Sequence, residues 1–118
     1  MKGVPLMAKE PTSAGVTTWL VDDQVWEDDD ETPGQVAMLV DSPTVQAGLW
    51  KPGPSGLGPF EVDLEHTEII LVLSGTGQLE VDDGAQVELT PGRAARIEVG
   101  AHTRWMVDQE FTELWLYV

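Results

Sequence analysis

Short stretches of alternating polar and apolar residues, separated by Gly, Pro and Asp, run through most of this chain. The segment Glu61–Gly77, EVDLEHTEIILVLSGTG, begins with such an alternation and then becomes almost wholly apolar. Successive side chains of a β-strand point to opposite faces, so this alternation is typical of strands with one buried face. Apolar residues rarely recur at the three- and four-residue spacing of a helix. The pattern therefore predicts an all-β fold.

The expected strands lie between clusters of turn residues, and several short strands with regular turns indicate a sandwich or a closed barrel. They cover residues 17–21, 34–40, 44–51, 62–75, 77–83, 85–90, 94–99, 103–108 and 111–118. Asp83 and Gly84 predict a tight hairpin, because both tolerate positive φ. Thr90-Pro91-Gly92 predicts a second reversal. The acidic run 26–34 is interpreted as a solvated loop.

One hydrophobic core fits a chain of 118 residues, of which 42% are hydrophobic. We expect a single barrel domain at residues 16–118. Residues 1–15 are mostly polar, include two prolines and show no period, so we expect a loose N-terminal tail there.

The net charge bears on partners and location. Twenty-one Asp and Glu against six Lys and Arg give −15, which repels phosphate backbones and anionic lipid surfaces. We therefore expect no nucleic-acid and no membrane partner. The absence of cysteine excludes thiolate chemistry and Cys-ligated zinc. No apolar run is long enough for a signal-peptide core or a membrane span, so we expect a cytoplasmic protein.

Three segments carry a family resemblance: residues 48–54 (GLWKPGP), 66–92 (HTEIILVLSGTGQLEVDDGAQVELTPG) and 97–107 (IEVGAHTRWMV). Together they resemble the cupin superfamily, in particular the small single-domain branch with the ureidoglycine aminohydrolases and the ethanolamine-utilization Q-type proteins. The resemblance spans residues 26–118. Its matching positions are Gly48, Trp50, Pro52, Gly53, Glu68, Gly75 and Trp105.

The resemblance implies a double-stranded β-helix, a jelly-roll barrel whose interior holds a ligand or a metal. Metal-binding members usually have three histidines and a glutamate. The three histidine positions fall here on Val62, Leu64 and Thr103, and the glutamate position on Glu68. Three of the four usual ligands are therefore replaced.

Strand alternation predicts which side chains face the barrel interior. Val62, Leu64, His66, Glu68, Ile70 and Val72 share one face, which is apolar except for the histidine and the glutamate. On the later strand the resemblance turns Thr103 and Trp105 inward and His102 outward. A register slip of one residue would reverse that assignment.

Glu68 and His66 are the candidate catalytic residues. Burial disfavours the charged form of a carboxyl group, so the pKa of Glu68 should rise toward neutrality, where the group can act as acid or base with His66. This chemistry suits a non-redox isomerase, lyase or cyclase. The structural alternative is that Glu68 simply hydrogen-bonds His66 or backbone amides.

Two other functions remain open. In a non-catalytic ligand-binding or sensor cupin, the barrel holds a small molecule against Trp50, Leu64, Ile70, Thr103 and Trp105.

In a metal-dependent cupin enzyme, an atypical set of His66, Glu68 and His102 holds a divalent transition metal, which requires the register slip that turns His102 inward. The expected cofactor is thus none or such a metal. Both faces of strand 111–118 are apolar, which indicates either a sandwich interior or a homodimer interface.

Overall fold

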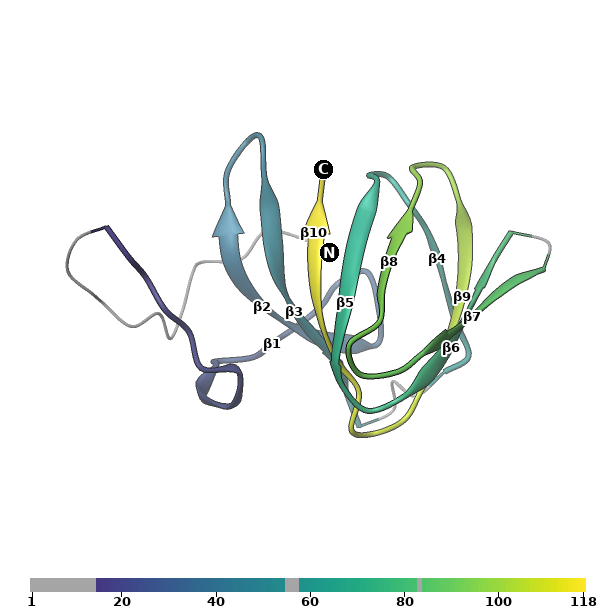
Figure 1. The fold of residues 1–118 in the computed structure, drawn as a ribbon, viewed down its shortest axis with the longest axis horizontal. Helices are drawn as coiled ribbons and strands as arrows, with labels where there is room; N and C mark the ends of the chain where they lie inside the picture. The colour runs from purple at the N-terminus through teal and green to yellow at the C-terminus, as the bar shows by residue number, and fades with distance from the viewer. Residues whose placement is uncertain (1–14, 55–57, 83) are drawn as a thin grey trace.

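The protein is described by a computed structural model that covers residues 15–54, 58–82 and 84–118. Within these residues it contains two antiparallel sheets and one short 3₁₀ helix, η1 (Val21–Asp23). The larger sheet has the order β1-β2-β3-β10-β5-β8 and the smaller one β4-β9-β6-β7 (Figure 1). None of the helices described is long and apolar enough to cross a membrane.

The strands of the larger sheet are β1 (Glu27–Asp28), β2 (Gly34–Asp41), β3 (Gln46–Pro52), β5 (Glu68–Ser74), β8 (Ala94–Ile97) and β10 (Thr112–Tyr117). Those of the smaller sheet are β4 (Phe60–Asp63), β6 (Gly77–Val81), β7 (Ala85–Leu89) and β9 (His102–Val107). The all-β jelly-roll fold expected from the sequence is confirmed.

The core lies between the inner faces of the two sheets. Its fully buried large side chains include Trp50, Trp115 and Phe111 from one side, and Leu79 and Leu89 from the other. On β9 the side chains alternate strictly: Thr103 and Trp105 are buried while His102 is exposed. The inward register predicted for this strand is thus the observed one.

The expected strand at 62–75 is wrong, because this segment forms parts of two strands in different sheets. β4 ends at Asp63 and β5 begins at Glu68, and the chain crosses between the sheets at residues 64–67. The backbone of Leu64 is held at this crossing by hydrogen bonds with Ala101 and Gly100. Neither Gly nor Pro marks the break, so the alternating pattern runs straight through it. His66 consequently lies on the connection rather than on a strand.

Two other local predictions have different outcomes. The strand expected at 17–21 reduces to a single bridge at Thr18, followed by η1. The reversal at residues 90–92 is confirmed, with Gly92 at φ 88° and the Arg93 N–H donating to the Thr90 carbonyl at 2.9 Å.

Two further predictions fall wholly or partly outside the described residues. Strands β6 and β7 pair as a hairpin, but Asp83 lies outside the described residues. So does nearly all of the N-terminal tail expected at 1–15.

The acidic run 26–34 is not the solvated loop that its composition suggested. Its residues form β1 and a turn that leads into β2, and Asp29 is 7% exposed. The Asp29 carboxylate accepts hydrogen bonds from the Glu31 backbone N–H at 3.1 Å and from the Thr32 hydroxyl at 2.7 Å. The Trp50 indole N–H in turn donates to the Thr32 hydroxyl at 2.8 Å. The acidic turn is therefore tied to a core tryptophan.

Gly34 gives this packing a direct test. A Cβ at this position would lie 2.4 Å from the Trp50 ring, so Gly34→Ala must displace the indole and disturb its hydrogen bond to Thr32. In an ordinary strand, replacing glycine by alanine would make the folded protein slightly more stable. Here we expect the free energy of unfolding, measured in urea, to fall by about 1–3 kcal/mol.

Gln35→Ala is the control, because it changes the next residue of β2, whose side chain points to the opposite face. A Gly34→Ala protein as stable as the parent would contradict the packing described.

Candidate functional site

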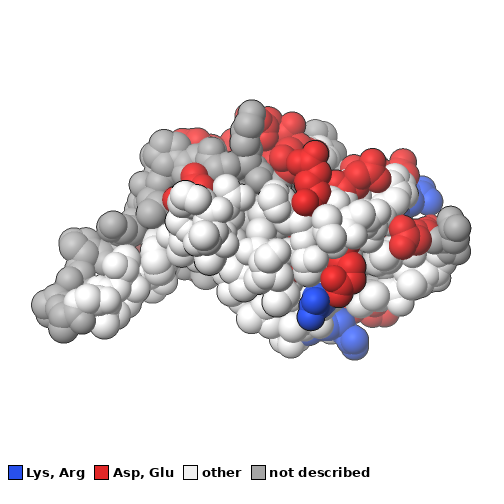
Figure 2. All heavy atoms as spheres, turned by 90° about the horizontal axis from the view of Figure 1, so that it is seen from above, with Lys and Arg blue, Asp and Glu red and all other residues white. Residues whose placement is uncertain are grey.

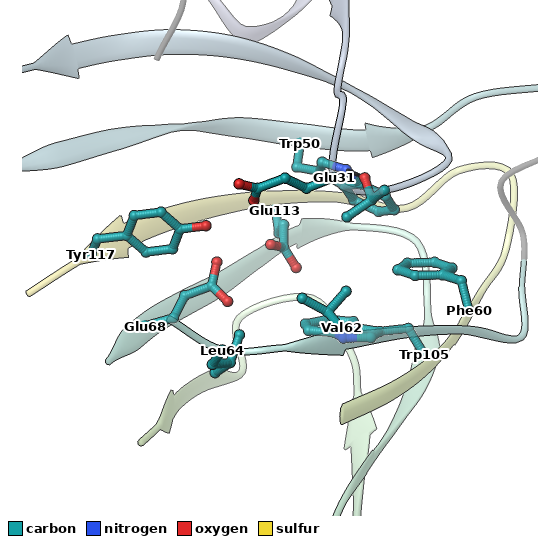
Figure 3. A pocket seen from close by; sticks show the side chains of 10 residues that line it. Glu31, Trp50, Phe60, Val62, Leu64, Glu68, Trp105, Glu113 and Tyr117 are labelled. Atoms are coloured by element: carbon teal, nitrogen blue, oxygen red, sulfur yellow. Dashed lines mark hydrogen bonds between the residues drawn. The ribbon is translucent and has the colours of Figure 1, made fainter. Parts of the chain in front are cut away.

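A small pocket opens between the two sheets and has a volume of about 30 Å³. Strands β3, β4, β5, β9 and β10 line it together with the acidic turn before β2 (Figure 3). Its lining residues are Glu31, Thr32, Trp50, Phe60, Val62, Leu64, Glu68, Trp105, Glu113 and Tyr117. We call it the inner pocket.

Glu68 is the first residue of β5, and its side chain points into the inner pocket (Figure 3). It is 4% exposed. Burial raises the pKa of Glu68 to about 7, and the negative charges of Glu31 and Asp29 contribute in the same direction. A carboxyl group with such a pKa exchanges protons readily near neutral pH.

Glu113 is a second buried carboxyl group in this pocket, and the sequence interpretation missed it. It lies on β10, is 1% exposed, and its Oε1 has no hydrogen-bond partner in the part of the chain described. Burial, and then the charge of Glu68, raise the pKa of Glu113 well above its ordinary value. Its neighbours across the sheet are Trp50 and Val72. The sequence did contain a signal for this position. Glu113, Trp115 and Tyr117 occupy alternate positions of the strand, so their side chains point to the same face.

Aromatic rings form much of the remaining wall. Phe60 lies between two indoles, with ring centroids 5.7 Å from Trp50 and 6.2 Å from Trp105. Its ring is almost parallel to that of Trp105, at 2°. Leu64, another predicted ligand-binding residue, also lines the pocket. Of the predicted set, the structure therefore brings Trp50, Leu64 and Trp105 to one cavity.

Ile70 and Thr103 are fully buried but do not line the inner pocket. Ile70 pairs with Trp115 in the larger sheet. The Thr103 hydroxyl donates to the Val62 carbonyl at 2.7 Å and accepts from the Trp105 indole N–H at 2.9 Å. Thr103 thus holds the Trp105 ring in place.

His66 lies outside the inner pocket. Its exposed ring stacks on Tyr117, with centroids 4.8 Å apart. It lines a larger outer depression of about 260 Å³, together with Glu31, Glu61, Val62, Asp63, Leu64, Glu65 and Tyr117. Four of these residues also line the inner pocket, so the two spaces adjoin. Figure 2 shows acidic side chains gathered along one side of the face it presents.

His102 points away from the barrel interior. Its ring nitrogens contact the carboxylates of Asp63 at 2.5 Å and Glu61 at 2.6 Å on the exposed side of the smaller sheet. Hydrogen bonds to Asp63 and then to Glu61 raise the pKa of His102. The structure therefore does not bring His66, Glu68 and His102 together.

The residues present do not fit a metal centre of the kind that the sequence resemblance implies. The positions of the three usual histidines hold Val62, Leu64 and Thr103, two apolar side chains and a hydroxyl already engaged in hydrogen bonds. In the described residues no group of three or more His, Asp or Glu side chains could hold a metal ion. Two carboxyl groups alone rarely retain a transition metal.

Comparison with known families gives a match over most of the chain. A family model described as the EutQ-like cupin domain matches residues 40–113. Among curated proteins, none matches the chain in sequence.

Solved structures share the fold at low identity. Ethanolamine utilization protein Q from Salmonella typhimurium superposes with a TM-score of 0.78 and 17% identity, covering 99% of this chain and 97% of its own. The EutQ protein of Clostridium difficile superposes with a TM-score of 0.69 and 16% identity, covering 97% of this chain and 88% of its own. An Fe(II) form of HppE with an alternative substrate superposes with a TM-score of 0.64 and 13% identity, covering 97% of this chain and 65% of its own. At these identities the likeness concerns the fold.

The two buried carboxyl groups predict an unusual pH dependence of stability. The folded protein holds the Glu68 proton more tightly than the unfolded chain does. The stability gained from this proton is therefore fully present below about pH 4.5 and is lost as pH rises through about 7. We expect a Glu68→Gln, Glu113→Gln double variant to lose less stability than the parent between pH 5 and 8. The difference should reach a few kcal/mol, since one pKa unit corresponds to about 1.4 kcal/mol.

Urea unfolding across this pH range measures the effect. Glu110→Gln is the control, because it removes a carboxyl group that is exposed. Parallel stability curves for the parent and the double variant would contradict the burial cost assigned to these groups.

Proposed function

This chain belongs to the EutQ-like cupin domain family, and we propose that its barrel binds a small molecule and moves a proton on it without redox chemistry. The reacting part of the ligand enters the inner pocket and the remainder occupies the outer depression. Isomerisation, elimination of water and ring closure are the reaction classes that such proton transfer serves.

The observation that carries this proposal is the pair of buried carboxyl groups in one pocket. Glu68 and Glu113 both line it, and burial raises the pKa of each. Where two such groups face one cavity, their mutual repulsion favours a state with one proton between them. One carboxyl can then accept a proton while the other donates one.

The two groups differ in access, and this difference assigns their roles. Glu68 is near the acidic turn and Tyr117, at the side where the outer depression adjoins. We assign it as the general acid or base. Glu113, deeper between Trp50 and Val72, holds a proton and donates it as a hydrogen bond. His66 lies at the rim, where it can exchange protons between Glu68 and solvent.

The test is a Glu68→Gln variant. A panel of small metabolites is incubated with the parent protein, and products are followed by NMR. We expect product from at least one compound with the parent and a loss of at least a hundredfold in rate with Glu68→Gln, which urea unfolding should show to be folded. Glu110→Gln should leave the rate unchanged. Equal turnover by Glu68→Gln would remove this residue from the mechanism.

A non-catalytic binding role is the second candidate, and the size of the inner pocket favours it. At about 30 Å³ the pocket is small beside ligand sites of roughly 300–1,000 Å³, which leaves little room for a substrate to change shape. This role predicts thermal stabilisation by compounds of the panel without product from any of them.

A homodimer remains a prediction. On the outer face of β10, Leu114 and Leu116 are half-buried, and Ile69 and Leu71 pair with them across the sheet. Such a face suits contact with a second copy of the chain. The molar mass in solution, measured by light scattering, distinguishes a dimer from a monomer.

A further inference from the structure

We propose that the inner pocket selects a primary ammonium group, which the carboxyl groups of Glu68 and Glu113 hold while the rest of the ligand lies in the outer depression. This inference rests on the proposed function in one respect, namely that the inner pocket is the ligand site. It adds the charge and the chemical class of the ligand.

The polar lining of the pocket consists mainly of acceptors. Carboxyl groups come from Glu31, Glu68 and Glu113, and no Lys, Arg, His, Asn or Gln is among the lining residues described. The Glu113 side chain is buried and points into the pocket (Figure 3), yet no described residue hydrogen-bonds its Oε1. An unpaired buried carboxyl oxygen is costly, and a ligand with N–H donors would satisfy it.

The donors around the pocket are mostly engaged elsewhere. The Trp50 indole N–H donates to Thr32, whose hydroxyl in turn donates to Asp29. The Trp105 indole N–H donates to Thr103. Both indoles therefore present ring surface to the pocket rather than their N–H groups. An anionic ligand would meet negative charge with few donors to hold it.

None of the described Lys and Arg side chains lines the inner pocket. The Lys51 ammonium lies 4.4 Å from the centre of the Trp26 ring. Arg96 contacts Glu98 at 3.0 Å, with both side chains exposed. Arg104 lies on the exposed side of β9. A cationic ligand would thus meet carboxyl groups beside which no described Lys or Arg lines the pocket.

The aromatic wall favours the same ligand class. Phe60 and Trp105 stack in parallel beside Trp50, and all three rings line the pocket. A cation over an aromatic face is attracted by the ring quadrupole, more strongly where water is excluded.

Size then separates one kind of ammonium from another. The inner pocket, at about 30 Å³, is small, so it favours a compact primary ammonium over a bulkier trimethylammonium. Three N–H donors also match the available carboxyl oxygens. The outer depression, at about 260 Å³, has room for a short chain, and its acidic rim attracts cations toward the entrance.

Binding should depend on pH. Among the described residues, the titratable groups that face Glu68 are Glu113 and Tyr117 on β10 and Glu31 and Asp29 on the acidic turn. An ammonium ion favours the ionised carboxyl, so binding should strengthen from pH 5 to 8 and release protons.

Three probes with the same four-carbon chain test the proposal: butylammonium, 1-butanol and butyrate. Each is titrated at constant ionic strength and pH 8 into the full chain, and binding is followed by the NMR signals of the tryptophan indole N–H groups. We expect butylammonium to bind at least tenfold more tightly than 1-butanol and butyrate to bind weakest. Tetramethylammonium should not shift the signals.

Two variants test whether the Glu113 carboxyl group is responsible for binding the ammonium. Glu113→Gln keeps the shape of the side chain and prevents the loss of its proton that a bound ammonium favours, so it should weaken butylammonium binding about tenfold while leaving 1-butanol unaffected. Glu110→Gln should change neither. Unfolding in urea confirms that each variant is folded.

Two results would overturn the inference. Equal affinity for butylammonium and 1-butanol would show an apolar pocket without charge selection, and the proton-transfer proposal would still stand on the Glu68→Gln test. Tight binding of Mn²⁺ that displaces butylammonium would assign the carboxyl groups to a metal ion instead of an organic cation.

Discussion

The position of β10 in the larger sheet determines what the pocket contains. This strand is hydrogen-bonded to β3 on one side and β5 on the other, so its inward residues stand in a fixed register against both neighbours. Glu113 is thereby placed beside Trp50, and Tyr117 beside Glu68. The register shifts between Thr112 and Glu113, which ends the regular pairing with β5 next to the carboxyl group. A slip of one residue would exchange these groups for leucines.

Two carboxyl groups in an apolar interior oppose folding, and the surrounding structure must compensate. The core tryptophans and Phe111 bury much apolar surface, and this contribution exceeds the cost of a few polar groups. One oxygen of Glu113 nonetheless receives no hydrogen bond from the residues that the structure describes. Such a group would be replaced by a leucine at little cost if stability alone mattered. Its retention in a cavity, beside a second carboxyl with a pKa of about 7, is typical of functional sites.

Strand alternation predicted much of this arrangement from the sequence, and it failed where the chain leaves a strand. Period-two patterning grouped Glu68 with the apolar inward residues of its strand, while the family resemblance turned Thr103 and Trp105 inward and His102 outward. His66 was placed on the same face as Glu68 because no turn residue marks the crossing between β4 and β5. Strand alternation could have placed Glu113 on the inward face, but a single acid in an apolar strand does not indicate which residue it faces. That information depends on strand order, which is a property of the whole fold.

The link between Thr32 and Trp50 joins the rim of the pocket to its wall. The acidic turn cannot move far while the indole N–H donates to Thr32, and the indole cannot tilt without releasing the turn. A ligand bound inside the barrel is therefore expected to make the backbone of the turn open less often. The Glu31 amide, which donates to the Asp29 carboxylate, would exchange its hydrogen with solvent more slowly when the cavity is filled. A single amide on the surface could thus report on a ligand that it never touches.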